Sequence, residues 1–425
     1  MSTKENHRKY CSIIFALMPL LGIYSIGVPF MSLGQTLFFM AVGFHIMSGN
    51  RLKTSILVVF SIYAVFITLL NILITPNVIV GDEVHDILAW LCFVFTIWGA
   101  LSYTDYHMFK KALVAFGYIS IVFFYVQLIL SLVGIKISGL MPLLPLASNW
   151  DYQSMVEKQL SSSRLCGFYM EPAHYAENAS LFLCFVLYKT SNIKYAILGG
   201  LIVTASILLS QSAMGGVMAL FVWAWWLLNR FKKKSFVIIL ILVLSIVPIL
   251  LSSGLIDSFL LRFSADYFSG EAGEGHFSTY IRTIRGYIPF LESDIVYKFI
   301  GHGFGSLQTY ILNNPKTDFL SVTDLIPNWI NGLSYLLLCT GIIGVGLFIT
   351  ALIKLYRNNS LIGRVMVIII LLLLGSSDSL FLSFQYFYIA KMEKRNFLDI
   401  TRMKGRGDIA KCIGVSTSCH QSKIT

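Results

Sequence analysis

The sequence predicts an all-α fold, a polytopic membrane helical bundle of about 11–12 transmembrane helices with two long loops on one side. Of its 425 residues, 56% are hydrophobic and 12% are charged, about half the ~25% charged residues of soluble domains. The apolar runs recur along the whole chain and lack the period-two alternation of barrel strands. A soluble globule and a disordered chain are therefore excluded, and we expect one membrane domain.

The apolar runs place the candidate spans in chain order. The first run is too long for a cleavable signal peptide, and another span follows it at once. The last run, 365–390, is interrupted by Gly-Ser-Ser-Asp-Ser at 375–379. This favours two short segments of re-entrant or hairpin character, with a single tilted helix as the alternative. The spans are 11–31, 32–48, 54–75, 84–103, 112–134, 173–188, 193–210, 213–228, 235–252, 331–353 and 365–390.

Spans and loops divide the chain into segments, which alternate between membrane and solvent. We expect N-terminal transmembrane helices, a first long loop, a second group of helices, a second long loop, C-terminal transmembrane segments and a basic tail. In that order they cover residues 1–134, 135–172, 173–252, 253–330, 331–390 and 391–425.

The basic residues indicate how the bundle is oriented. Short loops on the side of the N-terminus hold 16 of the 32 Lys and Arg residues, and short loops on the other side hold none. This asymmetry predicts a cytoplasmic N-terminus and long loops on the opposite face. The net charge of +11 then reflects the orientation of the chain in the membrane. We expect no nucleic-acid partner, but some attraction of the tail to anionic membrane lipids.

The first long loop ends in a helix start that suits anions. Pro172 fits the first helical turn, where its missing N–H costs nothing. The span that follows therefore has its positive dipole end at the loop side. Arg164 precedes it by eight residues. In the alternative interpretation, Glu171 and Pro172 only mark the start of the helix, and Arg164 is an ordinary surface charge.

Several polar residues follow that helix start on one face. Glu171, His174, Tyr175 and Asn178 are three or four residues apart. Glu177 lies about two turns inside the apolar zone, where a carboxylate is costly and usually functional.

The second long loop holds a pair of arginines and a glycine motif. Arg282 and Arg285 are three apart on a segment expected to be helical, and their planar forks suit pyrophosphate. The motif at 301–305, Gly-His-Gly-Phe-Gly, either lines a phosphate nest with backbone N–H groups or forms a tight turn. His302 is a possible general base or a solvated loop histidine.

Asparagine and aspartate residues come before the next span. Asp324 lies in the loop, and Asn331 stands at the mouth of a span containing Gly341 and Gly344. Asn331 either caps that helix or binds sugar hydroxyls.

Together these motifs resemble the bacterial O-antigen polymerases of the Wzy type. The resemblance rests on Arg-x-x-Gly-x-x-x-Glu-Pro at 164–172, the paired arginines, the glycine turn, and an Asn before a span with Gly-x-x-Gly. The layout matches over roughly 10–390, and the motifs match over about 160–180 and 280–345.

The resemblance implies a glycosyltransferase of the bacterial inner membrane with its site on the periplasmic side. It would join oligosaccharide repeat units carried on undecaprenyl pyrophosphate, without a cofactor. A chain-length regulator and a flippase of the same pathway are the implied partners. The absence of an Asp-x-Asp pair, and the sparse Cys412, Cys419 and His420, lead us to expect no metal.

The chemistry of that reaction assigns roles to the candidate residues. Arg164, Arg282 and Arg285 would stabilise the departing pyrophosphate. Glu171 is the first candidate for the base that takes the proton of the acceptor hydroxyl, followed by His174 and His302. Contacts to the sugars are expected from Glu177, which could instead orient His174, and from Asn178, Gly303, Asp324 and Asn331.

Other classes of protein stay open at this stage. An O-antigen ligase, which delivers glycan to lipid A core, shares the layout, but ligases usually have a His where this chain has Ile330. A flippase or transporter usually carries charges within its spans, whereas Lys and Arg here all lie outside them. A structural subunit is a third alternative.

Overall fold

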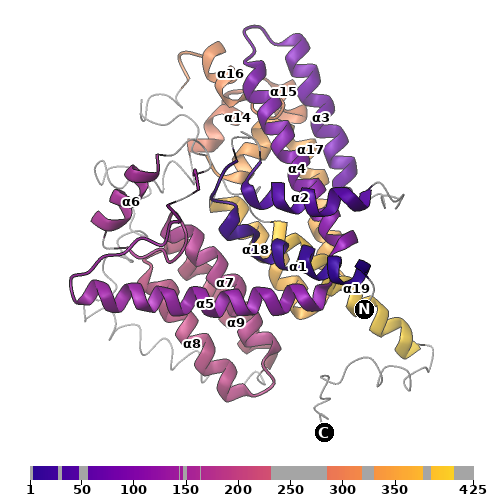
Figure 1. The fold of residues 1–425 in the computed structure, drawn as a ribbon. Coiled ribbons are helices and arrows are strands. Elements are labelled where there is room, and N and C mark those ends of the chain that lie inside the picture. Colours follow the sequence, from indigo (N-terminus) through magenta and orange to yellow (C-terminus); the bar gives the residue numbers. More distant parts are fainter. Residues whose placement is uncertain are drawn as a thin grey trace.

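The fold of the described residues is all-α. The structure is a computed structural model and describes residues 3–26, 31–46, 56–142, 144–146, 151–162, 164–230, 285–317, 330–376 and 384–405. Apart from isolated bridges near Tyr24 and Ser25, the regular elements in these ranges are helices (Figure 1). The candidate span 235–252, Arg282 and Asp324 lie outside the described residues.

The long helices follow the predicted apolar runs. They are α1 (Thr3–Leu21), α2 (Leu33–Ile46), α3 (Ile56–Ile74), α4 (Val80–Tyr103), α5 (Tyr106–Leu132), α7 (Pro172–Lys189), α8 (Ile193–Leu209), α9 (Ala213–Arg230), α17 (Gly332–Tyr356), α18 (Leu361–Ser376) and α19 (Phe384–Gly405). The long loops contain short helices: α6 (Tyr152–Ser161), the 3-10 helix η3 (Arg285–Tyr287), α14 (Ile288–Glu292), α15 (Ile295–Ile300) and α16 (Ser306–Asn313).

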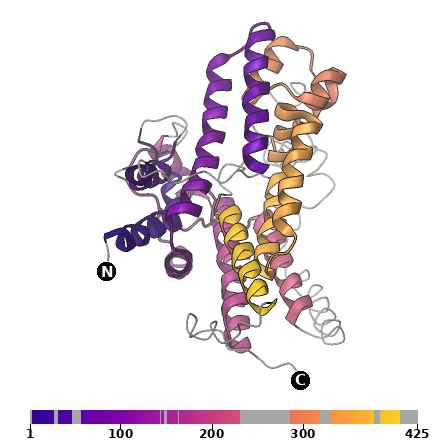
Figure 2. The same ribbon diagram turned by 90° about the vertical axis from the view of Figure 1, so that its right-hand side faces the viewer.

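Within the described residues, three of these helices are long and apolar enough to cross a membrane: α4, α5 and α17. A span needs about 20 apolar residues, and α2, α3, α8 and α18 have shorter apolar stretches. The chain is therefore a helical membrane protein, and the count of about 11–12 spans stays a prediction. Figure 2 shows α3, α4 and α17 side by side, in agreement with their contacts.

The ambiguous run 365–390 contains parts of two helices. α18 ends at Ser376, α19 begins at Phe384, and the two helices pack against each other. This agrees with the two-segment interpretation of the Gly-Ser interruption rather than with one tilted helix. α19 also continues through the basic residues after Lys391 to Gly405.

The ends of several helices meet around one buried carboxylate, Glu393 on α19. Tyr106 Oη donates to it at 2.7 Å, Ser360 Oγ donates at 2.8 Å, and Lys189 Nζ lies 3.2 Å away. Lys394 Nζ, one residue further, donates to the carbonyl of Lys354. We call this region, defined by these six residues, the basic end of the bundle. Three of the short basic loops that the charge count grouped together, 104–111, 189–194 and 354–364, meet here.

The described parts of both long loops lead into the opposite end of the bundle. α7 and α17 both finish at the basic end, so both begin at the other end, directly after a long loop. We call that other end, marked by Pro76, Gln211 and Asn331, the loop end. Asn313 Nδ2 donates to Pro76 O at 2.8 Å, which fixes α16 to the α3–α4 turn. In Figure 1, α6 and α14–α16 lie away from the N-terminus and α19.

The Glu393 contacts predict a stability that depends on pH. Burial alone raises the pKa of Glu393, but Lys189 and the donating hydroxyls more than offset it, so that its pKa is below the usual value. A lowered pKa stabilises the fold above the unfolded-state pKa of about 4.3, and this contribution is lost as the pH falls through the folded-state pKa.

We expect Glu393→Gln to lower the free energy of unfolding at pH 7 by roughly 1–3 kcal/mol, since Lys189 is partly exposed and its interaction is screened. Thermal unfolding in detergent at pH 7 and pH 3 measures this, and the difference from wild type should shrink at pH 3. The control is Glu5→Gln, an exposed carboxylate paired with Lys9. Equal effects of the two substitutions at pH 7 would contradict the prediction.

Candidate functional site

The first group of candidate residues surrounds the start of α7. Glu171 is the N-cap residue, with extended backbone angles of φ −134° and ψ 152°, and Pro172 occupies the first turn. The Glu171 carboxylate forms an ion pair with Lys158 Nζ of α6 at 3.3 Å. The helix therefore starts where the sequence predicted. To act as a base, the Glu171 carboxylate has to exchange Lys158 for a substrate hydroxyl.

Side chains from α5 and α6 hold the loop that carries Arg164. Gln127 is buried on α5. Its Oε1 accepts from Gly167 N at 2.9 Å, and its Nε2 donates to Ile137 O at 3.1 Å. Gln159 Nε2 donates to Tyr169 O at 2.9 Å. Arg164 Nη2 donates to Gln211 O of the α8–α9 turn at 3.3 Å, so the arginine lies at the loop end.

The face of α7 that follows is partly buried. Asn178 Nδ2 donates to the carbonyl of His174, one turn earlier, at 2.9 Å. His174 and Asn178 are half-buried, whereas Glu177 is buried at 8% exposure. The Glu177 carbonyl accepts from Tyr386 Oη of α19 at 2.7 Å, which anchors this turn inside the bundle.

The second group surrounds the start of α17. Arg285 of η3 has no exposed surface and is among the largest fully buried side chains of the described residues. A Cβ on the next residue, Gly286, would lie 2.2 Å from Ser334 Oγ, so only glycine lets η3 pack on α17 this closely. Asn331 Oδ1 accepts from Ser334 N at 2.8 Å. Of the two alternatives for Asn331, the structure has the helix cap, and a sugar contact stays a prediction.

The glycine motif forms a tight turn with positive φ angles. Gly301, Gly303 and Gly305 have φ values of 85°, 89° and 74°. The five backbone N–H groups of 301–305 all donate to protein acceptors: Tyr297 O, Leu338 O, Cys339 O, Thr68 Oγ1 and Tyr335 Oη. The turn therefore leaves none of these N–H groups for a phosphate nest. A contact between Gly303 and a sugar stays a prediction.

This turn lies inside the bundle, against a break in α17. Gly341 departs from helical geometry, with φ 61° and ψ −172°. The carbonyls of Leu338 and Cys339, just before the break, accept from His302 N and Gly303 N at 2.8 Å each. In a membrane such carbonyls need internal donors, and the turn supplies them. The 301–305 turn of the second long loop thus packs between α3 and α17.

Two aromatic rings and one hydrogen bond hold the side chain of His302. Its ring stacks on Tyr297, with centroids 4.1 Å apart, and meets the ring of Tyr310 edge-on. Ser293 Oγ donates to Pro289 O at 2.6 Å, which uses its proton, so His302 Nε2 carries the hydrogen of the 2.8 Å bond to Ser293 Oγ. Burial lowers the pKa of His302 to about 4. The imidazole is therefore neutral at pH 7 and a weak base.

The lowered pKa of His302 predicts a loss of stability in mild acid. Between the unfolded-state pKa of about 6.5 and the folded-state value, the unfolded chain binds a proton that the folded chain does not, so stability falls as the pH drops through this window. His302→Gln should remove on the order of 2–3 kcal/mol of this dependence. Unfolding in detergent at pH 7.5 and pH 4.5 measures it, with exposed His107→Gln as control. An unchanged pH dependence in His302→Gln would disprove the assignment.

Acidic residues of α4 complete the surroundings of the turn. Tyr335 Oη, which accepts from Gly305 N, donates to Asp86 Oδ2. Glu83 is fully buried, and its Oε1 accepts from Asn71 Nδ2 at 2.6 Å. Sequence reasoning missed these residues. The signal available was the group of acidic residues at 82–86, because carboxylates within a membrane span are rare and usually functional.

The candidate residues that the structure describes thus form two groups. Arg164, Glu171, His174, Glu177 and Asn178 surround the start of α7, and the other set, Arg285, His302, Gly303 and Asn331, surrounds the start and break of α17. No family model matches this sequence, and no curated protein matches it significantly.

Proposed function

We propose that this protein polymerises lipid-linked oligosaccharide repeat units of the O-antigen type on the periplasmic face of the bacterial inner membrane. It acts as a glycosyltransferase and passes the growing glycan from undecaprenyl pyrophosphate to the next repeat unit. The N-terminus is cytoplasmic, and the loop end faces the periplasm. Partners in this proposal are a chain-length regulator and a flippase of the same pathway.

The buried guanidinium of Arg285 is the observation that carries the proposal. A charge without exposed surface lies in a medium of low effective dielectric, where its attraction for an anion is much stronger than in water. Its position is fixed before a ligand arrives, so little reorganisation is needed as negative charge develops. In this proposal Arg164 and the positive end of α7, which begins at Pro172, add to the field that favours a pyrophosphate.

The reaction needs one proton acceptor and one anion stabiliser. The acceptor hydroxyl attacks the anomeric carbon of the donor, and the bond between that carbon and the pyrophosphate oxygen breaks. The electron pair leaves on the pyrophosphate, and the hydroxyl proton passes to a base. Glu171 fits this role better than His302, because Glu171 is at the open loop end and its partner Lys158 is 57% exposed, whereas His302 is enclosed and weakly basic.

The residue before Asn331 favours polymerase over ligase. Ile330 is buried and packs with Leu307 and Leu338, so this position has neither the proton-transfer group nor the exposure expected of the ligase histidine. A ligase that transfers glycan to lipid A core is the second candidate, and the same experiment separates the two.

Lipopolysaccharide gels of cells that lack the protein test the proposal. A polymerase predicts that the ladder disappears while one repeat unit stays attached to core. Loss of all attached sugar would indicate a ligase or a flippase, and an intact ladder would refute the proposal. Expression of the protein from a plasmid should restore the ladder.

A further inference from the structure

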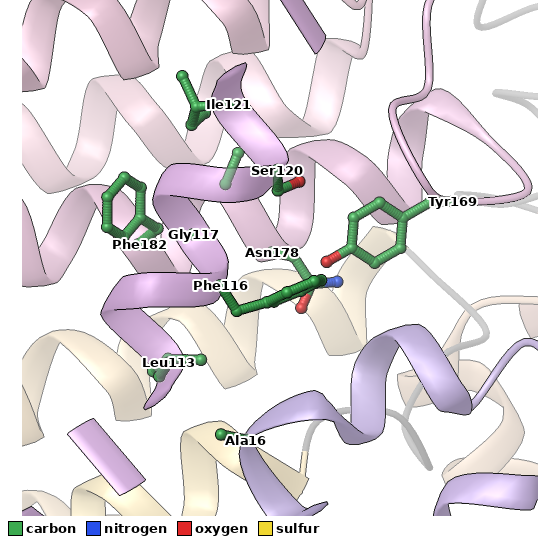
Figure 3. A pocket seen from close by; sticks show the side chains of 10 residues that line it. Ala16, Leu113, Phe116, Gly117, Ser120, Ile121, Tyr169, Asn178 and Phe182 are labelled. Carbon is green, nitrogen blue, oxygen red and sulfur yellow. The ribbon is translucent and has the colours of Figure 1, made fainter. Parts of the chain in front are cut away.

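The cavity between α1, α5 and α7 is too small to hold a ligand. It has room for about one water molecule. Figure 3 shows how the side chains of Phe116, Tyr169 and Asn178 crowd around it. By contrast, residues 286–313 present exposed apolar side chains at the loop end.

Residues 286–313 form a hairpin that enters the bundle at the loop end and leaves it there. Gly286 packs on the first turn of α17. Along α14 and α15 the chain then reaches the break at Gly341, where the turn 301–305 bonds to carbonyls of α17. α16 returns to the α3–α4 turn, to which its last residue bonds. Figure 2 shows these short helices, in orange, beside one end of α17. We call residues 286–313 the hairpin.

The turn of the hairpin lies at the depth of the hydrocarbon core of a membrane. α17 has 25 residues, so it is about 37 Å long and exceeds the ~30 Å core by about 7 Å. Gly341 follows the first residue of α17 by nine residues, which corresponds to about 13 Å. Even if the whole excess length lies at the loop end, Gly341 and the turn bonded beside it are about 6 Å inside the core.

Four apolar side chains of the hairpin are exposed, with exposed fractions from 49% to 67%. Those on α15 share one face, because the helical repeat places positions i, i+1 and i+4 on the same side. A contiguous apolar surface of this kind marks an interaction site. We call the four side chains the apolar face of the hairpin. They are Leu291 of α14 and Ile295, Val296 and Phe299 of α15.

The apolar face continues into the exposed surface of α17. The carbonyl oxygen of Phe299 lies against Gly341, since a Cβ there would be 2.3 Å from it. The next two residues of α17, Ile342 and Ile343, are exposed. α17 is a candidate membrane span, so exposed apolar side chains in its middle are expected to face lipid. The outer side of α15 is therefore in line with a lipid-facing surface.

The charged residues before α15 lie where the hairpin would meet the membrane surface. Glu292 and Asp294 are exposed and precede α15. Carboxylates are costly in hydrocarbon, whereas the headgroup region solvates them. Lys298 is the charged residue within α15. It lies one turn after Asp294, and its long stem lets the ammonium group reach the headgroups.

We infer that the hairpin is re-entrant and that its apolar face contacts the acyl chains of the lipid leaflet at the loop end. A protein partner on the aqueous side would reach only the start of α15, because the end of α15 lies at core depth. The inference concerns the placement of the second long loop and does not depend on the reaction that the protein catalyses.

Fluorescence quenching in vesicles tests this inference with the full-length protein. Val296 is replaced by the fluorescent amino acid acridonylalanine through suppression of an amber codon, and the protein is reconstituted in phosphatidylcholine vesicles. Phosphatidylcholine with a doxyl group on an acyl chain quenches fluorophores that contact lipid, and iodide quenches those that contact water. We expect the doxyl lipid to remove most of the fluorescence at this position and iodide to remove little.

Two control positions and two depths complete the measurement. Ile119 is exposed on the candidate span α5 and should behave like Val296. Lys316, exposed just beyond α16, should be quenched by iodide and not by the lipid. A doxyl group near the middle of the acyl chain should quench the fluorophore at Phe299 more than at Leu291. A doxyl group near the headgroup should show the opposite order, because the chain descends from α14 to the end of α15.

Two results would overturn the inference. Quenching by iodide at Val296 as strong as at Lys316 would place the hairpin in water. Quenching by neither reagent, with both control positions responding, would mean that protein covers the apolar face. The lipopolysaccharide gels are independent of both results, so this inference and the proposed function can fail separately.

Discussion

Replacing Arg285 with methionine is expected to abolish the polymer ladder while the protein still reaches the membrane. Methionine keeps most of the buried volume but removes the charge. In a site that excludes water, loss of one preorganised donor lowers a rate by about 10²–10³. Arg285→Lys should retain a partial ladder, because it keeps the charge but loses the paired hydrogen bonds of the guanidinium. Gel analysis at matched protein levels measures the result.

A matched control separates this effect from the loss of any arginine. Arg357 is exposed and directly follows the last residue of α17, at the basic end of the bundle. Arg357→Met should therefore leave the ladder unchanged. A full ladder in Arg285→Met at normal membrane levels would show that this charge does not take part in the reaction.

Gly341→Ala is expected to produce the largest loss of stability. Gly341 has φ 61°, and an added Cβ would lie 2.3 Å from the carbonyl oxygen of Phe299. Backbone strain and steric overlap together predict a loss of roughly 2–5 kcal/mol. The substitution should also separate the 301–305 turn from α17, because the same break receives the N–H groups of that turn. Unfolding of the purified protein in detergent measures the loss.

The same helix offers the control. Gly346 is helical, and nothing lies within 4 Å of a Cβ built on it. Gly346→Ala should therefore leave stability unchanged or raise it by about 0.5–1 kcal/mol, the helix preference of alanine over glycine. Similar melting temperatures for the two variants would contradict the packing of the turn against the break.

Local sequence signals predicted the elements well. The apolar runs located the long helices, since burial in lipid or protein depends on runs of apolar side chains. Pro172 located the start of α7 because proline is tolerated in the first turn. The interruption after Gly375 indicated two helices, and α18 and α19 flank it.

Long-range contacts could not be predicted from these signals. Nothing near Gly301 in the sequence indicates that its turn inserts at a break 40 residues later, or that Tyr63 Oη donates to Ile300 O and Thr340 O at 2.9 and 3.2 Å. The glycine spacing alone suits a phosphate nest as well as it suits a tight turn. The acceptors of the N–H groups, which decide between the two, lie far away in the sequence. Burial of His302 depends likewise on the distant α17 carbonyls.

Reconstitution tests the central claim most directly. Purified protein in vesicles would receive a synthetic repeat unit on undecaprenyl pyrophosphate, without nucleotide sugars or lipid A core. We predict glycan polymers on the lipid carrier and one undecaprenyl pyrophosphate released for each linkage formed, with neither product from Arg285→Met. Unchanged repeat units with no released pyrophosphate, or transfer only when lipid A core is added, would contradict the account.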